Sequence, residues 1–96
     1  MIREKLKYRR DRYGTFETGM MARSKSGHDA GKVYVITKVE EAYVYLVDGK
    51  VRTLDKPKKK KKKHVQLIKE SFDIQGATDV DIKRWIKIWN KEDNQN

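Results

Sequence analysis

The sequence predicts a mainly β fold, in which a small antiparallel barrel of five short strands precedes a C-terminal α-helix. Two runs, residues 32–39 (KVYVITKV) and 43–47 (YVYLV), are rich in β-branched and aromatic side chains and are bounded by glycine, charged or turn residues, which favours strands. Short, closely spaced strands favour a barrel, because closure hides the sheet edges of a chain that is too small for a large core. Apolar residues that recur at helical spacing after residue 79 indicate the helix.

The first two predicted strands flank a glycine-containing loop. Residues 20–23 form the short first strand, and the loop that joins them to residues 32–39 contains Gly27 and Gly31, which allow positive φ. Strand alternation makes both faces of residues 32–39 apolar, which is typical of a barrel strand with a helix packed outside. The predicted faces carry Val33, Val35 and Val39 on one side and Tyr34 and Ile36 on the other.

The last two strands are predicted from a turn and a short apolar run. Asp48-Gly49 is a dipeptide that a type I′ hairpin turn prefers, because both central residues of that turn need positive φ. Residues 51–54 are therefore predicted to pair with residues 43–47 as the fourth strand. The run 64–68 (HVQLI) is predicted to return as the fifth, closing strand.

A helix is predicted over about residues 79–91. Thr78 and Asp81 approximate a capping box at its start, and the apolar stripe consists of Ile82, Trp85, Ile86 and Trp89. We expect the two tryptophans to pack against the barrel instead of stacking on bases. If the helix were detached, they would form a surface for a partner.

Composition points to a polyanionic partner. The 96 residues suit one domain, and 24 Lys and Arg against 14 Asp and Glu give a net charge of +10, which favours nucleic acid or an anionic membrane surface. The chain has no cysteine, no apolar run near the roughly 20 residues of a membrane-spanning helix, and no apolar segment of a secretory signal at its start. We therefore expect a cytoplasmic, monomeric protein that does not bind membranes.

The strongest charge signal is six consecutive lysines at residues 58–63. Their mutual repulsion predicts an extended, mobile loop over residues 56–63 that a polyanion would order. Each lysine that neutralises a phosphate releases a condensed counterion, and lysine lacks the bidentate fork of arginine, so we expect attraction to the backbone more than base reading. The alternative is a solvated, solubilising loop.

Residues 18–36 (TGMMARSKSGHDAGKVYVI), followed by VDGK and the lysines, resemble the KOW motif of small SH3-like barrels. More closely, the segment resembles the eukaryotic and archaeal large-subunit ribosomal proteins with an N-terminal KOW domain, and their short bacterial KOW-containing relatives. The resemblance covers roughly residues 18–69. It implies an SH3-like five-stranded barrel and a non-enzymatic protein that binds ribosomal RNA or helps assemble the large subunit.

These observations predict three segments and one set of RNA-binding residues. Residues 1–17 form a basic extension, residues 18–70 the barrel with the lysine loop, and residues 71–96 a linker and the helix. The predicted RNA-binding residues are Arg23, Lys25, His28, Lys32, Lys50, Arg52, Lys56, Lys58, Lys59, Lys60, Lys61, Lys62, Lys63 and His64, with Arg9, Arg10 and Arg12 as an additional set. We expect no cofactor, no metal and no catalytic residue, because adjacent His28 and Asp29 lack a convergent third group.

Several alternatives stay open at the level of sequence. The basic extension either folds on a phosphate backbone or remains a frayed terminus. Tyr43 and Tyr45 either stack on bases or, as we expect, pack within the sheet. A KOW-type module can instead bind a protein in transcription or translation, with Trp85 and Trp89 on its contact surface. Attachment to anionic membranes is a third reading, but no amphipathic anchor adjoins the lysines.

Overall fold

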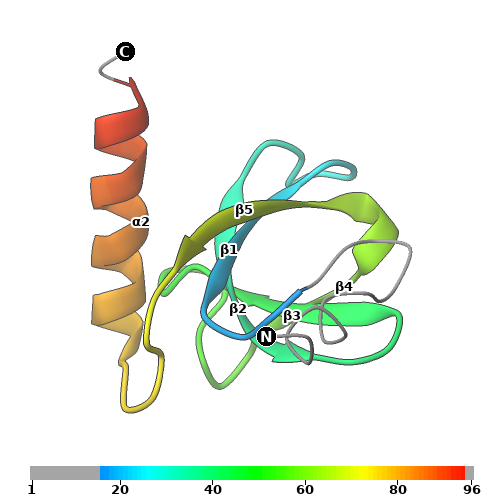
Figure 1. Cartoon of the computed structure of the whole chain (residues 1–96), viewed down its shortest axis with the longest axis horizontal. Coiled ribbons are helices and arrows are strands. Elements are labelled where there is room, and N and C mark those ends of the chain that lie inside the picture. Colours follow the sequence, from blue (N-terminus) through cyan, green and yellow to red (C-terminus); the bar gives the residue numbers. More distant parts are fainter. Residues whose placement is uncertain (1–15, 95–96) are drawn as a thin grey trace, which may run out of the picture.

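Five antiparallel strands form one curled sheet, a half-barrel, and a C-terminal helix stands against its outer side (Figure 1). The computed structural model describes residues 16–94. The elements are β1 (Met20–Ser24), β2 (Val33–Val39), β3 (Tyr43–Val47), β4 (Lys58–Lys61), the 3₁₀ turn η1 (Lys62–His64), β5 (Val65–Ser71) and α2 (Asp79–Asn94). The strand order is β4-β3-β2-β1-β5, which confirms the predicted five-stranded, mainly β fold with a C-terminal helix.

Two apolar clusters lie on the two faces of the sheet. One fills the concave side and contains Phe16, Ala22, Tyr34, Ile36, Val44, Leu46 and Val65. The other lies between the sheet and α2 and contains Met21, Val33, Val35, Val47 and Ile82. Trp85 and Trp89 pack against this second cluster, so the expectation that they would contact the barrel is confirmed.

Alternation along β2 holds for its first half and then changes. Val33 and Val35 face α2, whereas Tyr34 and Ile36 face the concave cluster, as predicted. Val39 was predicted on the face of Val33, but it packs against the concave cluster. The cause is an irregularity in the β2–β3 register between Ile36 and Lys38, because an extra residue in a strand reverses the faces that follow it.

The predicted fourth strand is wrong. Residues 51–54 lie in a turn region, and Asp48 does not adopt positive φ, so no type I′ turn forms. The Asp48 Oδ1 atom instead accepts hydrogen bonds from the backbone N–H groups of Lys50, Val51 and Arg52, at 2.9, 3.0 and 2.8 Å. The carboxylate thus organises a longer connection.

The strand that pairs with β3 is made of lysines. Lys58–Lys61 form β4 and pair antiparallel with Tyr43–Leu46, and η1 then leads directly into β5. The lysine loop predicted over residues 56–63 is therefore wrong in its secondary structure. The backbone groups of β3 need partners whatever the side chains opposite, and the lysine segment supplies them.

The helix begins at the predicted cap and is anchored to the β3–β4 connection. The Thr78 N–H donates to Asp81 Oδ2 at 3.0 Å, and the Asp81 N–H donates to Thr78 Oγ1 at 3.2 Å, which completes the capping box. The Thr78 hydroxyl also donates to Asp81 Oδ2 at 3.1 Å, and the two bonds that this carboxylate accepts from Thr78 lower the pKa of Asp81. The Leu54 N–H donates to Asp79 Oδ1 at 2.8 Å, so the connection is bound to the first turn of α2. Among residues 16–94, no helix is both long and apolar enough to cross a membrane.

Candidate nucleic-acid interface

The β3–β4 register separates the lysines of β4 into two sets. Lys58 and Lys60, the inner lysines, lie opposite Leu46 and Val44, whose side chains belong to the concave cluster. Lys59 and Lys61 lie opposite Tyr45 and Tyr43 and are exposed on the outer face. With the exposed Lys63 of η1, they form a set that we call the outer lysines.

The inner lysines converge on the buried Asp29. Lys60 Nζ lies 3.0 Å from Asp29 Oδ1, and Lys58 Nζ lies 3.4 Å from Oδ2. The Ser24 hydroxyl donates to Oδ1 at 2.9 Å, and the Tyr34 hydroxyl donates to Oδ2 at 3.2 Å. Asp29 therefore joins the β1–β2 loop to β4 across the concave side.

This network controls the ionisation of Asp29 and Tyr34. Burial raises the pKa of the Asp29 carboxyl, but hydrogen bonds from Lys60 and Ser24 and the charges of the two lysines outweigh burial, and the pKa lies well below its ordinary range. Burial and the adjacent Asp29 carboxylate raise the pKa of Tyr34 to about 12. The inner lysines consequently hold a structural ion pair and are only partly available to a ligand.

Lys62 is also turned inward. Its side chain is buried at 5% exposure, and its ammonium lies 5.5 Å from the ring centroid of Phe16. The Lys62 N–H donates to the Ala42 carbonyl at 2.9 Å, which fixes η1 to the start of β3. The three outer lysines are thus well exposed to solvent, whereas the inner lysines are half-buried and Lys62 is buried.

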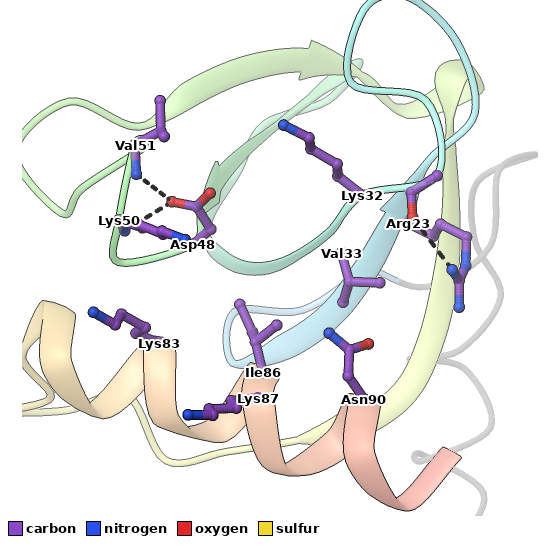
Figure 2. A pocket seen from close by; sticks show the side chains of 11 residues that line it. Arg23, Lys32, Val33, Asp48, Lys50, Val51, Lys83, Ile86, Lys87 and Asn90 are labelled. Atoms are coloured by element: carbon purple, nitrogen blue, oxygen red, sulfur yellow. Dashed lines mark hydrogen bonds between the residues drawn. The ribbon is translucent and has the colours of Figure 1, made fainter. Parts of the chain in front are cut away.

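A basic cleft opens between the sheet and α2 (Figure 2). It has a volume of about 560 Å³. Its floor is apolar where Val33 meets Ile86. Its cationic residues are Arg23 of β1, Lys32 before β2, Lys50 of the β3–β4 connection, and Lys83 and Lys87 of α2. Residues that are distant in sequence thus bring positive charge to one cleft.

The only negative group in the described lining of the cleft already accepts hydrogen bonds from the protein backbone. Asp48 is the one carboxylate among the lining residues of this cleft, and its Oδ1 atom accepts the three backbone hydrogen bonds described above. Arg23 is also partly engaged, because its guanidinium donates to the Gly31 carbonyl at 3.3 Å and lies 5.7 Å from the Trp89 ring centroid. Arg23 and the four lysines outnumber the single carboxylate, so the lining of the cleft keeps a net positive charge.

Lys83 and Lys87 lie one helical turn apart, and like charges at this spacing destabilise a helix. Three further cations of the cleft add to this repulsion. A bound anion would offset it, which marks the cleft as a candidate anion site. A conflict between local charge and fold is expected at functional sites more than elsewhere.

The other predicted binding residues are scattered around these two surfaces. Lys25, His28 and Lys56 are exposed, and Arg52 and His64 are half-buried. The His64 carbonyl accepts a hydrogen bond from the Lys25 N–H at 2.8 Å, so this pair joins the β1–β2 loop to η1 through the backbone. The additional set of Arg9, Arg10 and Arg12 lies outside the described residues.

Sequence reasoning missed Lys83 and Lys87 as site residues. Their spacing of four residues on one helical face was visible, but nothing in the sequence placed that face beside Lys32 and Lys50. Tyr43 and Tyr45 were expected to pack within the sheet, but they belong to neither apolar cluster of the described residues.

His28 and Asp29, which are adjacent in sequence, differ in burial. Asp29 is buried among cations, whereas His28 is exposed, so the two neighbours occupy separate environments. Among the side chains that the structure describes, no three of His, Cys, Asp or Glu are grouped so as to hold a metal ion. No protein family and no curated protein matches this chain.

Proposed function

We propose that this protein is a non-enzymatic RNA-binding protein that associates with the large ribosomal subunit, as a component or during its assembly. The observation that carries RNA binding is the cleft in which cations from β1, the β1–β2 loop, the β3–β4 connection and α2 converge. The ribosomal part rests on the resemblance of residues 18–69 to large-subunit KOW proteins. The net charge of +10 supports both.

The mechanism is electrostatic capture on a rigid platform. Four of the cleft cations are lysines, which bind phosphates as point charges and favour the backbone over the reading of base edges. The curled sheet and the anchored helix hold the two walls of the cleft apart, so the spacing of phosphates decides which RNA fits. Recognition by the shape of folded RNA follows from this arrangement.

The test compares two double variants of α2 with equal loss of charge. K83Q/K87Q removes two cleft cations, and R84Q/K91Q removes two exposed cations outside the cleft lining. Binding of a structured ribosomal RNA fragment is measured by fluorescence anisotropy between about 50 and 200 mM salt. K83Q/K87Q should weaken binding several-fold and reduce the salt slope by about 1.4 to 1.8, given a slope of about 0.7 to 0.9 per phosphate contact.

The control variant should bind nearly as well as the wild type, with a slope that falls by less than about half as much. Thermal stability of K83Q/K87Q should be equal or slightly higher, because like charges at i and i+4 are removed. Equal losses in the two variants would refute the cleft as the site. Sedimentation of a lysate at low and high salt tests the ribosomal part, since the protein should co-migrate with large subunits and leave them at high salt.

A second candidate function is binding to a protein partner. A groove of about 210 Å³ runs beside α2, lined by Glu70, Phe72, Trp85, Ile88 and Trp89. Ile88 is 49% exposed there, and the Phe72 and Trp85 rings stack with centroids 4.6 Å apart. If the groove binds a protein, the complex should survive nuclease treatment and high salt, and the variant Ile88→Lys should not form it. Val80→Lys, at a residue 62% exposed outside the groove, is the matched control.

A further inference from the structure

The outer face of β3 and β4 combines two tyrosine rings with exposed cations. The register places Tyr43 opposite Lys61 and Tyr45 opposite Lys59. Both tyrosines are half-buried and lie outside the two apolar clusters, so their rings are not used to build the core. An aromatic ring beside lysines on an open sheet is an arrangement that binds the bases and phosphates of a single strand.

The present partners of these tyrosines are exposed lysines and Glu40, whose Oε2 atom accepts a hydrogen bond from the Tyr45 hydroxyl at 3.3 Å. Lys59 Nζ lies 4.5 Å from the ring centroid of Tyr43 and 5.8 Å from that of Tyr45, and Lys38 Nζ lies 5.2 Å from the Tyr45 centroid. The same two ammonium groups lie 3.8 and 3.7 Å from the Glu40 carboxylate, and these pairs are well exposed. Exposed pairs of this length contribute little, so a phosphate can replace them.

A recess beside Tyr43 has the size and lining for one nucleotide. Its volume is about 300 Å³, and it is lined by Ala42, Tyr43, Lys61 and Lys63. One wall is aromatic, and two exposed ammonium groups stand beside it. We propose that this recess binds an unpaired nucleotide of RNA, with the base stacked on Tyr43 and the phosphate held by Lys61 and Lys63. Tyr45 offers a ring for a neighbouring base.

The geometry of a strand favours unpaired bases over a duplex. Tyr43 and Tyr45 are alternate residues of β3, so they lie about 7 Å apart along the strand. Successive bases of a stacked helix are only about 3.4 Å apart and turn their faces to one another. Two bases can therefore use both rings only when they are splayed apart, as in RNA loops and single strands. This inference rests on the proposed RNA binding and adds a second mode of recognition to that of the basic cleft beside α2.

The experiment uses the full chain and two RNAs. One is a single-stranded oligonucleotide of about ten residues without self-complementarity, with 2-aminopurine at one internal position. The other is a blunt RNA duplex without unpaired bases. Tyr43→Leu removes the ring, Tyr43→Phe keeps it, and K61Q/K63Q removes the cations of the recess without touching the core.

Tyr43→Leu should weaken binding of the single strand about tenfold and abolish the quenching of 2-aminopurine, with duplex binding changed less than about twofold. Tyr43→Phe should retain both signals. K61Q/K63Q should weaken single-strand binding and lower its salt slope by about 1.4. Suppose that the wild type binds both RNAs and that folded Tyr43→Leu has the same affinity and the same 2-aminopurine quenching as the wild type. This result would overturn the stacking site and leave the proposed function intact. Failure of the wild type to bind either RNA would overturn both.

Discussion

Replacing Asp29 with asparagine should destabilise the fold by about 3 kcal/mol at pH 7, because it leaves the inner lysines without their counter-charge. The substitution keeps the shape of the side chain. It removes the carboxylate from two ammonium groups at 3.0 and 3.4 Å, whose side chains are 10% and 28% exposed. Breaking a buried ion pair costs about 3 to 5 kcal/mol, and the lower figure applies because Lys58 is exposed enough to turn toward water.

The pH dependence distinguishes lost charge from lost packing. The folded-state pKa of Asp29 lies below its value in the unfolded chain, so its contribution is complete above about pH 4 to 5 and is lost as pH falls toward the folded pKa. The free-energy gap between wild type and Asp29→Asn should therefore narrow by up to about 1.4 kcal/mol per pH unit below about pH 4.

Urea unfolding followed by circular dichroism, from pH 7 down to about pH 2.5, measures this gap. Asp55→Asn is the control, since it makes the same chemical change at an exposed carboxylate. Asp55→Asn should stay within about 0.5 kcal/mol of the wild type. The reasoning fails if the two variants unfold alike at pH 7, or if the gap for Asp29→Asn does not depend on pH.

Three further predictions concern the lysines of β4 and η1, the stability of the fold at high pH, and the β3–β4 connection. Replacing the three outer lysines with glutamine should lower the salt slope of RNA binding by about 2 and leave the melting temperature nearly unchanged. Glutamine at both inner lysines should instead lower the melting temperature. If the outer replacements destabilised the fold and the inner ones did not, the division into inner and outer lysines would be wrong. Because the pKa of Tyr34 is raised to about 12, its contribution to stability is complete below about pH 10 and is lost as pH rises toward 12. In urea unfolding between about pH 10 and pH 12, the free energy of unfolding of Tyr34→Phe should fall less steeply with pH than that of the wild type. Identical pH profiles of the two proteins would count against the Tyr34–Asp29 contact. In thermal unfolding, Gly49→Ala should lower the free energy of unfolding by at least about 1 kcal/mol more than Gly76→Ala does. Both glycines have positive φ, 78° and 76°, but a Cβ at Gly49 would overlap the Asp79 carbonyl oxygen, whereas a Cβ at Gly76 would meet nothing. Equal losses of stability would argue against the contact between Gly49 and Asp79.

Local sequence pattern predicted most of the secondary structure. β1, β2, β3 and β5 follow runs of β-branched, aromatic or apolar residues, and α2 follows an apolar stripe behind a capping box. The fourth strand was predicted at residues 51–54 because Asp48-Gly49 is typical of a tight hairpin turn, which would pair these residues with residues 43–47. The backbone of β3 needed a partner, and that tertiary demand outweighed the low propensity and mutual repulsion of the lysines.

The sequence by itself determined the amount of positive charge, the β character of the chain and the position of its helix. Only the tertiary structure decided which cations can meet a ligand. Six identical lysines contain no internal signal for register, and a slip by one residue would exchange the inner and outer sets without changing the type of any side chain on either face. The register is fixed from outside the run, by Ala42 at the start of β3 and by the η1–β5 junction, and these contacts turn Lys59, Lys61 and Lys63 toward solvent.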